Sequence, residues 1–231
     1  MVDIHDYLKR MKDVYWANPQ AAVRSQGFIQ ILHEYLEAYC RSRLSQRAIN
    51  RGIKVQREAK LFGSHKPKDV DIAVIDPENG PLITIGVRSQ MSSVGKNVLT
   101  YYQDIVGECI SLQERFPMTT MGYVYLHPRI EPIADRKVPN HARYAHMYAN
   151  IGHRDDRLYK SMVGSYDQFA YMVVDFDDPN LKICDDIVEH AVPNMDMKIE
   201  TFVDRLIETF NTRNLWLDWV FKPLETLPPS P

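Results

Sequence analysis

Three stretches of the chain place hydrophobic residues at the three- and four-residue spacing of an amphipathic helix. The clearest covers residues 24–50 and stops before Gly52, a residue type that commonly ends helices. Similar spacing predicts helices over about 96–116 and 197–218. The inward positions of the first helix are Phe28, Ile31, Leu32, Tyr35, Leu36 and Tyr39. We therefore expect three long helices, each with one face packed against a core.

Between the first two helices the hydrophobic period changes to the two-residue alternation of β-strands. Residues 53–62 predict a polar strand, and residues 69–75 and 82–88 alternate more cleanly. The sequence Asp-Pro-Glu-Asn-Gly at 76–80 favours a tight turn, so the strands on either side of it are predicted to form a hairpin. Two further buried strands are predicted at 121–127 and 169–176.

This succession of helices and strands predicts an α/β protein in which a mixed β-sheet is flanked by helices. A length of 231 residues fits one domain, which we place at residues 1–222. Residues 128–155 lack a clear period and are expected to be a loop or an insertion. Residues 223–231 are expected to be a flexible tail.

The composition is that of an ordinary globular protein, with 45% hydrophobic and 25% charged residues. No apolar run approaches the ~18 residues that cross a bilayer. The first residues are too polar to resemble a signal peptide, so no membrane partner is expected. The cysteines are far apart in the sequence and form no CxxC pair; they are Cys40, Cys109 and Cys184. We expect buried free thiols and a cytoplasmic protein.

Charge is unevenly distributed although the net charge is only −2. Between Arg41 and Lys68 the single acidic residue is Glu58, whereas acids dominate from Asp175 to Glu208. A basic stretch of this kind is what binding to a polyanion such as DNA requires. A solvated helix face followed by a polar strand would give the same pattern. The basic residues are Arg41, Arg43, Arg47, Arg51, Lys54, Arg57, Lys60, Lys66 and Lys68.

Candidate chemistry is concentrated in residues 68–97. The two-residue period of strand 82–88 places Gly86 and Arg88 on one face, and hairpin pairing brings Asp71 toward the same edge. Mg²⁺ prefers oxygen ligands, usually one or two carboxylates, and phosphodiester cleavage also needs an activated water and a cation near the phosphate. Asp71 meets the first need and Arg88 part of the second, although a guanidinium does not act as a base near neutral pH.

Residues 68–126 resemble the PD-(D/E)xK nuclease superfamily. The sequence Arg-Ser-Gln-Met-Ser-Ser-Val-Gly-Lys-Asn at 88–97, followed by an amphipathic helix, is similar to certain type II restriction endonucleases. In those enzymes the second strand reads Glu-aliphatic-Lys-Ser-Gln. Asp71 matches the metal-binding Asp of the family, whereas Gly86 and Arg88 stand where its Glu and Lys are expected. The next two positions, Ser89 and Gln90, match the family pattern.

The resemblance implies a restriction-endonuclease-like fold and a Mg²⁺- or Mn²⁺-dependent endonuclease that hydrolyses phosphodiester bonds in double-stranded DNA. It also implies a homodimer, because two cuts need two sites. Asp71, Arg88 and Gln90 are the candidate catalytic residues. The candidate metal ligands are Asp71, Glu37 of the first helix (with Glu34 as its alternative) and Glu108 of the next helix (beside Asp104). The candidate DNA contacts are Lys60, Lys66, Lys68 and Lys96.

The missing Glu and Lys leave a second interpretation open. A protein of the same fold without catalytic activity would bind DNA or take part in an assembly, and the helical acids would then be ordinary surface positions. The histidines at 141, 146 and 153 have no Cys or Glu partner at the spacing of a zinc site, so zinc is not expected there.

Overall fold

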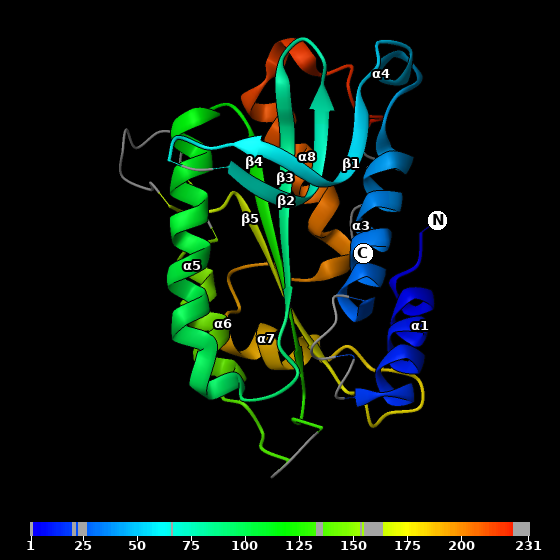
Figure 1. Ribbon diagram of the computed structural model, residues 1–231, viewed down its shortest axis with the longest axis vertical. Coiled ribbons are helices and arrows are strands. Elements are labelled where there is room, and N and C mark those ends of the chain that lie inside the picture. Colours follow the sequence, from blue (N-terminus) through cyan, green and yellow to red (C-terminus); the bar gives the residue numbers. More distant parts are fainter. Residues whose placement is uncertain are drawn as a thin grey trace, which may run out of the picture.

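The computed structural model describes residues 2–19, 22, 27–65, 67–132, 136–152, 154 and 164–223. Its centre is a five-stranded sheet in the order β1-β2-β3-β4-β5, flanked by helices (Figure 1). The strands are β1 (Lys54–Phe62), β2 (Pro67–Asp76), β3 (Gly80–Ser89), β4 (Thr120–Pro128) and β5 (Gln168–Val174). The helices are α1 (Ile4–Ala17), α3 (Gly27–Arg43), α4 (Gln46–Asn50), α5 (Val94–Arg115), α6 (His141–Ala149), α7 (Asp185–Ala191) and α8 (Ile199–Arg213), followed by the 3₁₀ turn η1 (Leu215–Leu217).

The sheet is mixed, which confirms the predicted α/β class. The pairs β1–β2 and β2–β3 are antiparallel, whereas the pairs β3–β4 and β4–β5 are parallel. The predicted hairpin is present, with Asp76 opposite Gly80 at its turn. Gly80 has a φ of +81°, a conformation that side-chain-bearing residues rarely adopt. Helix α5 makes the crossover from β3 to β4 that a parallel pair requires.

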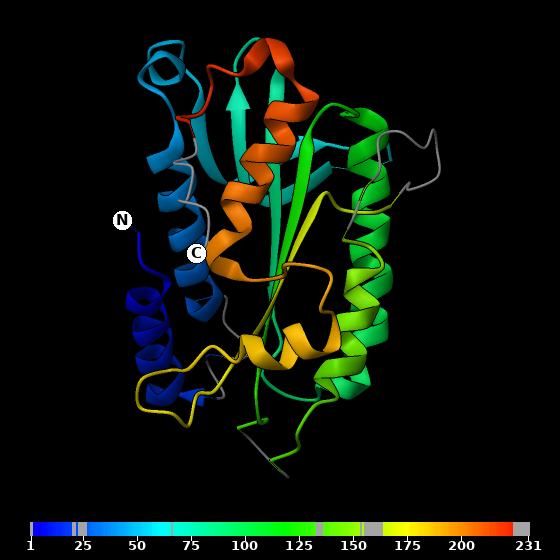
Figure 2. The ribbon, with the colours of Figure 1, turned by 180° about the vertical axis from the view of Figure 1, so that it is seen from behind.

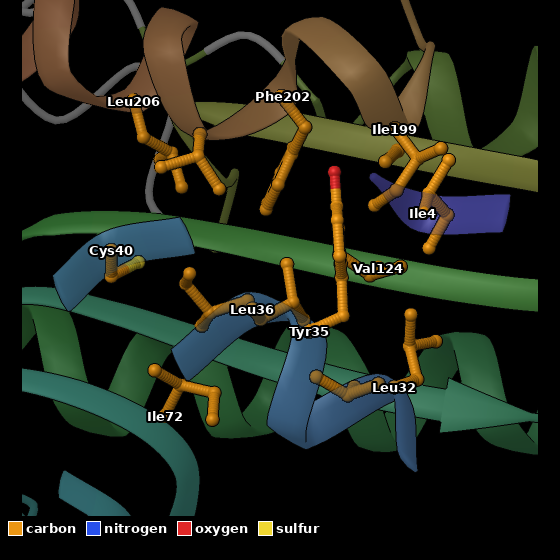
Figure 3. Packing of buried hydrophobic residues seen from close by; sticks show 14 of the residues in the cluster. Ile4, Leu32, Tyr35, Leu36, Cys40, Ile72, Val124, Ile199, Phe202 and Leu206 are labelled. Carbon is orange, nitrogen blue, oxygen red and sulfur yellow. The ribbon is translucent and has the colours of Figure 1, made fainter. Parts of the chain in front are cut away.

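Hydrophobic side chains are buried on both faces of the sheet. On one face α3 and α8 pack against the strands, and Leu36 and Phe202 lie beside Ile72 and Val124 (Figure 3). Figure 2 shows α8 lying along this face. On the other face α5 and α6 cover a largely aromatic surface formed by Tyr123, Tyr125, Phe169 and Tyr171. Because both faces are covered, β4 is buried along its whole length.

The helix predicted over 24–50 is two helices in the structure. Helix α3 ends at Arg43, and Ser45 caps α4 by accepting a hydrogen bond from the Ala48 N–H at 3.0 Å. The Ser45 N–H donates to the Val220 carbonyl at 3.0 Å, so the C-terminal segment satisfies the backbone at the break. Gly52 has a φ of +82° just after α4, where the helical pattern was predicted to stop.

The expectation of a loop over 128–155 is corrected in its middle, which forms helix α6. Asn140 caps this helix by accepting a hydrogen bond from the Arg143 N–H at 3.1 Å. Its buried face consists of His141, Tyr144, Ala145 and Tyr148 and so has few aliphatic residues, which obscured the helical period. Helices α1 and α7 were not predicted either, and residues 224–231 of the expected tail lie outside the described residues.

The cysteines behave as predicted, since Cys40, Cys109 and Cys184 are buried and free. Within the ranges that the structure describes, no helix has both the length and the apolar surface needed to cross a membrane.

Candidate metal centre

The hairpin strands β2 and β3 separate at one end. Their pairing runs from Asp76 opposite Gly80 to Ile72 opposite Ile85 and stops there. Beyond this point β3 continues along β4, while β1 and β2 stay paired and curve away (Figure 1). Where the strands part, Oδ2 of Asp71 accepts a hydrogen bond from the Val87 N–H at 2.6 Å. The Asp71 side chain therefore satisfies a backbone donor that has lost its strand partner.

A cavity of about 720 Å³ lies in the angle between the separating strands. Helix α3, strands β1 and β2, the end of β3, the loop after it and helix α5 all contribute to its lining. The cavity is thus built from segments that the sheet topology gathers at one edge. The predicted position of Asp71 beside the Arg88-bearing end of β3 is confirmed, because both residues line this cavity.

Three side chains from three elements meet at the cavity: His33 of α3, Glu58 of β1 and Asp71 of β2. Nδ1 of His33 lies 3.3 Å from Oε1 of Glu58, and its Nε2 lies 3.8 Å from Oδ1 of Asp71. One ligand atom from each residue lies within 4.8 Å of the other two. A nitrogen and two carboxylate oxygens at this separation could hold a metal ion.

The position of Glu58 depends on an unusual backbone conformation. Its neighbours Arg57 and Ala59 pair with Ile72 and Val70, so Glu58 lies opposite Asp71. Its φ is +48°, in the left-handed region where a residue other than glycine is strained. Strain of this kind persists where surrounding structure holds it, often at functional sites. The side chain also accepts a hydrogen bond from Gln30 Nε2 at 3.3 Å, which holds the carboxylate beside α3.

His33 is the buried member of the group, with 1% of its surface exposed. Neither ring nitrogen has a hydrogen-bond partner among the described residues, although both carboxylates are close. Burial lowers the pKa of His33, and the nearby Glu58 opposes that shift only in part. A buried polar group without a well-aligned hydrogen bond costs about 1–3 kcal/mol, a cost that a cation bound between the three side chains would reduce.

The pKa of the Asp71 carboxyl group lies above its ordinary value. Burial raises its pKa to about 6, and the nearby charge of Glu58 adds to the rise. The hydrogen bond from Val87 and the charge of Lys68 act in the opposite direction. In the absence of a cation, the carboxylates of Glu58 and Asp71 therefore repel each other in a partly desolvated site. A divalent ion would favour the ionised form of both acids.

Gly86 leaves no room for the carboxylate that the family pattern places there. A Cβ built on Gly86 would lie 2.6 Å from Cδ2 of Tyr123, its partner in the β3–β4 register. The Tyr123 ring is itself stacked on Phe169, with centroids 5.6 Å apart, so it has little freedom to move. Within the group described here, the second carboxylate is supplied by Glu58 of β1.

The other two predicted catalytic residues also line the cavity but differ in freedom. The Arg88 guanidinium lies over the Tyr101 ring, 4.3 Å from its centroid, which fixes the charge beside the cavity. Gln90 is buried; its Oε1 accepts from the Tyr125 hydroxyl at 2.8 Å and its Nε2 donates to the Ser93 carbonyl at 3.1 Å. The Gln90 amide therefore holds the loop in place, with both ends already bonded.

The predicted helical ligands lie outside the group of three. Glu37 pairs with Arg41 at 2.6 Å and with Arg57 at 2.9 Å, on the surface of α3. Glu108 lines the cavity, but its carboxylate is bonded to the Lys68 ammonium. The alternative residues also lie outside this group: Glu34 pairs with Arg10 at 2.7 Å, and Asp104 is exposed on α5. The residue that helix α3 contributes to the group of three is His33.

The predicted DNA contacts are divided among different surroundings. Lys60 is exposed on β1 opposite Asp69, which lines the cavity, and Lys96 is exposed in the first turn of α5. Lys68 is engaged with Glu108, and Lys66 lies outside the described residues. Much of the rest of the basic stretch has partners within the protein: Arg47 stacks on Trp219, and the ion pairs are Arg41–Glu37, Arg43–Asp204, Arg51–Glu78 and Arg57–Glu37.

Sequence reasoning missed His33 and Glu58. Glu58 carried a usable signal, because it is the single acid in the basic stretch and lies on the strand that precedes the hairpin. Aligning that strand with 69–75 places Glu58 opposite Asp71. His33 had a weaker signal, since it follows Leu32 at the margin of the buried face of its helix.

Comparison of the chain with protein-family models, with curated proteins and with solved structures found no match.

Proposed function

We propose that this protein is a divalent-metal-dependent phosphodiesterase, an endonuclease of restriction type that acts on double-stranded DNA. The observation that carries the proposal is the group of His33, Glu58 and Asp71 in a cavity that also contains two cationic side chains. Metal ligands and cations in one cavity suit a reaction in which negative charge builds up on a phosphate.

In this proposal His33, Glu58 and Asp71 hold the cation, Mg²⁺ or Mn²⁺. An ion bound there would supply Lewis acidity, which would polarise a phosphoryl oxygen and lower the pKa of a water molecule. Hydrolysis adds water across one P–O bond: the water oxygen bonds to phosphorus, the ester oxygen departs, and one proton moves to that oxygen. The residues of the chain orient the phosphate and handle this proton.

Arg88 and the Lys68–Glu108 pair take these remaining roles. Arg88 offers N–H donors to a non-bridging phosphate oxygen from its fixed position over Tyr101. Lys68 is bonded to Glu108 within the cavity, so the pair presents one proton donor and one acceptor side by side. This pair supplies the ammonium that Arg88 cannot replace, since a guanidinium does not release its proton.

Support for DNA as the substrate comes from the exposed lysines around the cavity. Lys60 projects from β1 next to the cavity-lining Asp69, and Lys96 lies beside the cavity-lining Asn97. Exposed lysines near a cavity can contact the phosphates of a polyanion without regard to base sequence.

The alternative function is that of a catalytically inactive protein of nuclease fold that binds DNA. The observation that favours it is the Tyr123 ring over Gly86, which fills the place of a family carboxylate. The two functions differ in one assay. Purified protein is incubated with plasmid and phage DNA and with Mg²⁺ or Mn²⁺, and the products are separated on a gel alongside an Asp71→Asn variant.

Cleavage by the wild type that disappears in the variant supports the endonuclease. A shift of uncut DNA with every ion tried, equal in both proteins, overturns it in favour of the binding function. Since phosphate contacts release counterions, that shift should weaken with salt at a log–log slope of about −0.9 per contact.

A further inference from the structure

The donor set of the metal centre is unusual for Mg²⁺. It comprises one imidazole nitrogen from His33 and two carboxylates from Glu58 and Asp71. Mg²⁺ takes oxygen ligands and retains several waters, whereas imidazole is a preferred ligand of transition metals. The nitrogen donor therefore points away from the ion that the family resemblance implies.

His33 is built into the protein and has no room to turn away. Its ring is 1% exposed, and α3 packs against β1, β2 and β3, which fixes the ring over the two acids. Each ring nitrogen faces one carboxylate, Nδ1 toward Glu58 and Nε2 toward Asp71. When one ring nitrogen binds a cation, the second ring nitrogen therefore still lies beside a carboxylate. A carboxylate in that position fixes the tautomer and the orientation of a metal-binding imidazole.

Two independent features indicate that the three residues surround an ion rather than bond to one another. The first is that neither nitrogen of His33 makes a hydrogen bond within the described structure, despite distances of 3.3 and 3.8 Å to the acids. The second is the left-handed φ of +48° at Glu58, which places a strained residue opposite Asp71. A simple histidine–carboxylate contact would need neither feature.

We propose that this centre selects Mn²⁺, a divalent transition-metal ion, over Mg²⁺, and that His33 is responsible for this preference. The inference rests on the proposed function only in using the same site, and it holds whether or not DNA is cut. The oxygen ligands Glu58 and Asp71 accept either ion. The imidazole adds affinity for the transition metal alone.

The test measures binding and coordination. Mn²⁺ and Mg²⁺ are titrated by calorimetry at pH 7.5 into the wild type, into His33→Asn and into Asp69→Asn, a carboxylate variant in the same cavity but outside the group. At position 33, Asn replaces the nitrogen donor by an oxygen in a similar position. We expect the ratio of Mn²⁺ to Mg²⁺ affinity to fall at least about tenfold in His33→Asn and to stay within about threefold in Asp69→Asn.

A second measurement needs no variant. Pulsed electron spin resonance of Mn²⁺ bound to the wild type should show coupling to a ¹⁴N nucleus, replaced by ¹⁵N coupling when the protein carries ¹⁵N-histidine. Absence of nitrogen coupling, an unchanged affinity ratio in folded His33→Asn, or no Mn²⁺ binding at all overturns the inference. Nitrogen-coordinated Mn²⁺ without any DNA cleavage overturns the proposed function and leaves the metal preference standing.

Discussion

Two buried histidines on opposite faces of the sheet make an instructive pair. His33 and His127 are 1% and 0% exposed, and neither has a hydrogen bond to its ring nitrogens among the described residues. Burial lowers the pKa of both imidazoles, most strongly that of His127. By burial and hydrogen bonding alone, the two residues would be equal candidates for a functional site.

Their surroundings separate them. His127 is enclosed by rings, with the centroid of Tyr125 at 4.1 Å and that of Tyr171 at 5.0 Å. In the described residues it belongs to no group of three possible metal ligands, whereas His33 faces two carboxylates and an open cavity. An orphaned buried imidazole therefore indicates a site only where anionic partners and access for a ligand accompany it.

The largest expected effect comes from changing one of the carboxylates that distinguish the surroundings of His33 from those of His127. Asp71→Asn keeps an oxygen that accepts from Val87 and so preserves the strand junction, but it removes a charge from the cation site. Mn²⁺ affinity should fall more than about a hundredfold, and any hydrolysis should fall at least as far. The matched control is Asp69→Asn, which changes an acid of the same strand and cavity outside the group. Equal loss in both variants would show a general charge effect.

Replacing each histidine by phenylalanine sharpens the comparison directly. His127→Phe keeps a ring among rings and removes two unpaired nitrogens, so the free energy of unfolding should change by less than about 1 kcal/mol or rise. His33→Phe should lower Mn²⁺ affinity at least about tenfold. Chemical denaturation and calorimetry on both variants check this, and a metal defect in His127→Phe would contradict it.

Position 86 tests how rigid the aromatic face is. A methyl group at Gly86 would overlap the Tyr123 ring, so Gly86→Ala should destabilise the protein by about 1–3 kcal/mol. Gly107→Ala is the control, because a Cβ there meets nothing within 4 Å and alanine favours the helix. Restoring the Glu of the family pattern with Gly86→Glu should therefore lower stability and should not increase cleavage above that of the wild type. A gain of cleavage in that variant would mean that Tyr123 gives way.

The smallest effect is a pH dependence of stability in the absence of metal. The pKa of Asp71, about 6, lies above its value in the unfolded chain, so the folded state binds this proton more tightly. The contribution of Asp71 to stability should therefore rise as pH falls from above 6 to about 4. Thermal unfolding with a chelator should show Asp71→Asn more stable than the wild type at pH 7.5, with the gap closing by pH 4. Parallel curves would contradict the shift.

The hydrophobic periodicity predicted much of the fold, whereas predicting the candidate site also required knowing which residues pair across neighbouring strands. The alternation of 69–75 and 82–88 and the turn between them gave the hairpin, and with it the meeting of Asp71 and Arg88. The break after Arg43 depends on backbone contacts with Val220, far along the chain, which no local pattern encodes. Helix α6 was missed because its buried face is aromatic.

The proposed metal ligands were only partly predictable for a related reason. Family spacing directed attention to Glu37 and Glu108, both of which have cationic partners in the fold. Glu58 reaches the site through a left-handed backbone conformation, and His33 through the packing of α3 over the diverging strands. Neither the backbone conformation of Glu58 nor the packing of α3 can be inferred from the local sequence alone.

The central claim is that Glu58, and not an acid of α3, completes the cation site begun by Asp71 and His33. Titration of Mn²⁺ into Glu58→Gln and Glu37→Gln tests this claim most directly, because both changes neutralise one carboxylate and keep its shape. We predict a loss of about a hundredfold in affinity for Glu58→Gln and less than about threefold for Glu37→Gln. The reverse order, or equal affinity in both variants and the wild type, would contradict it.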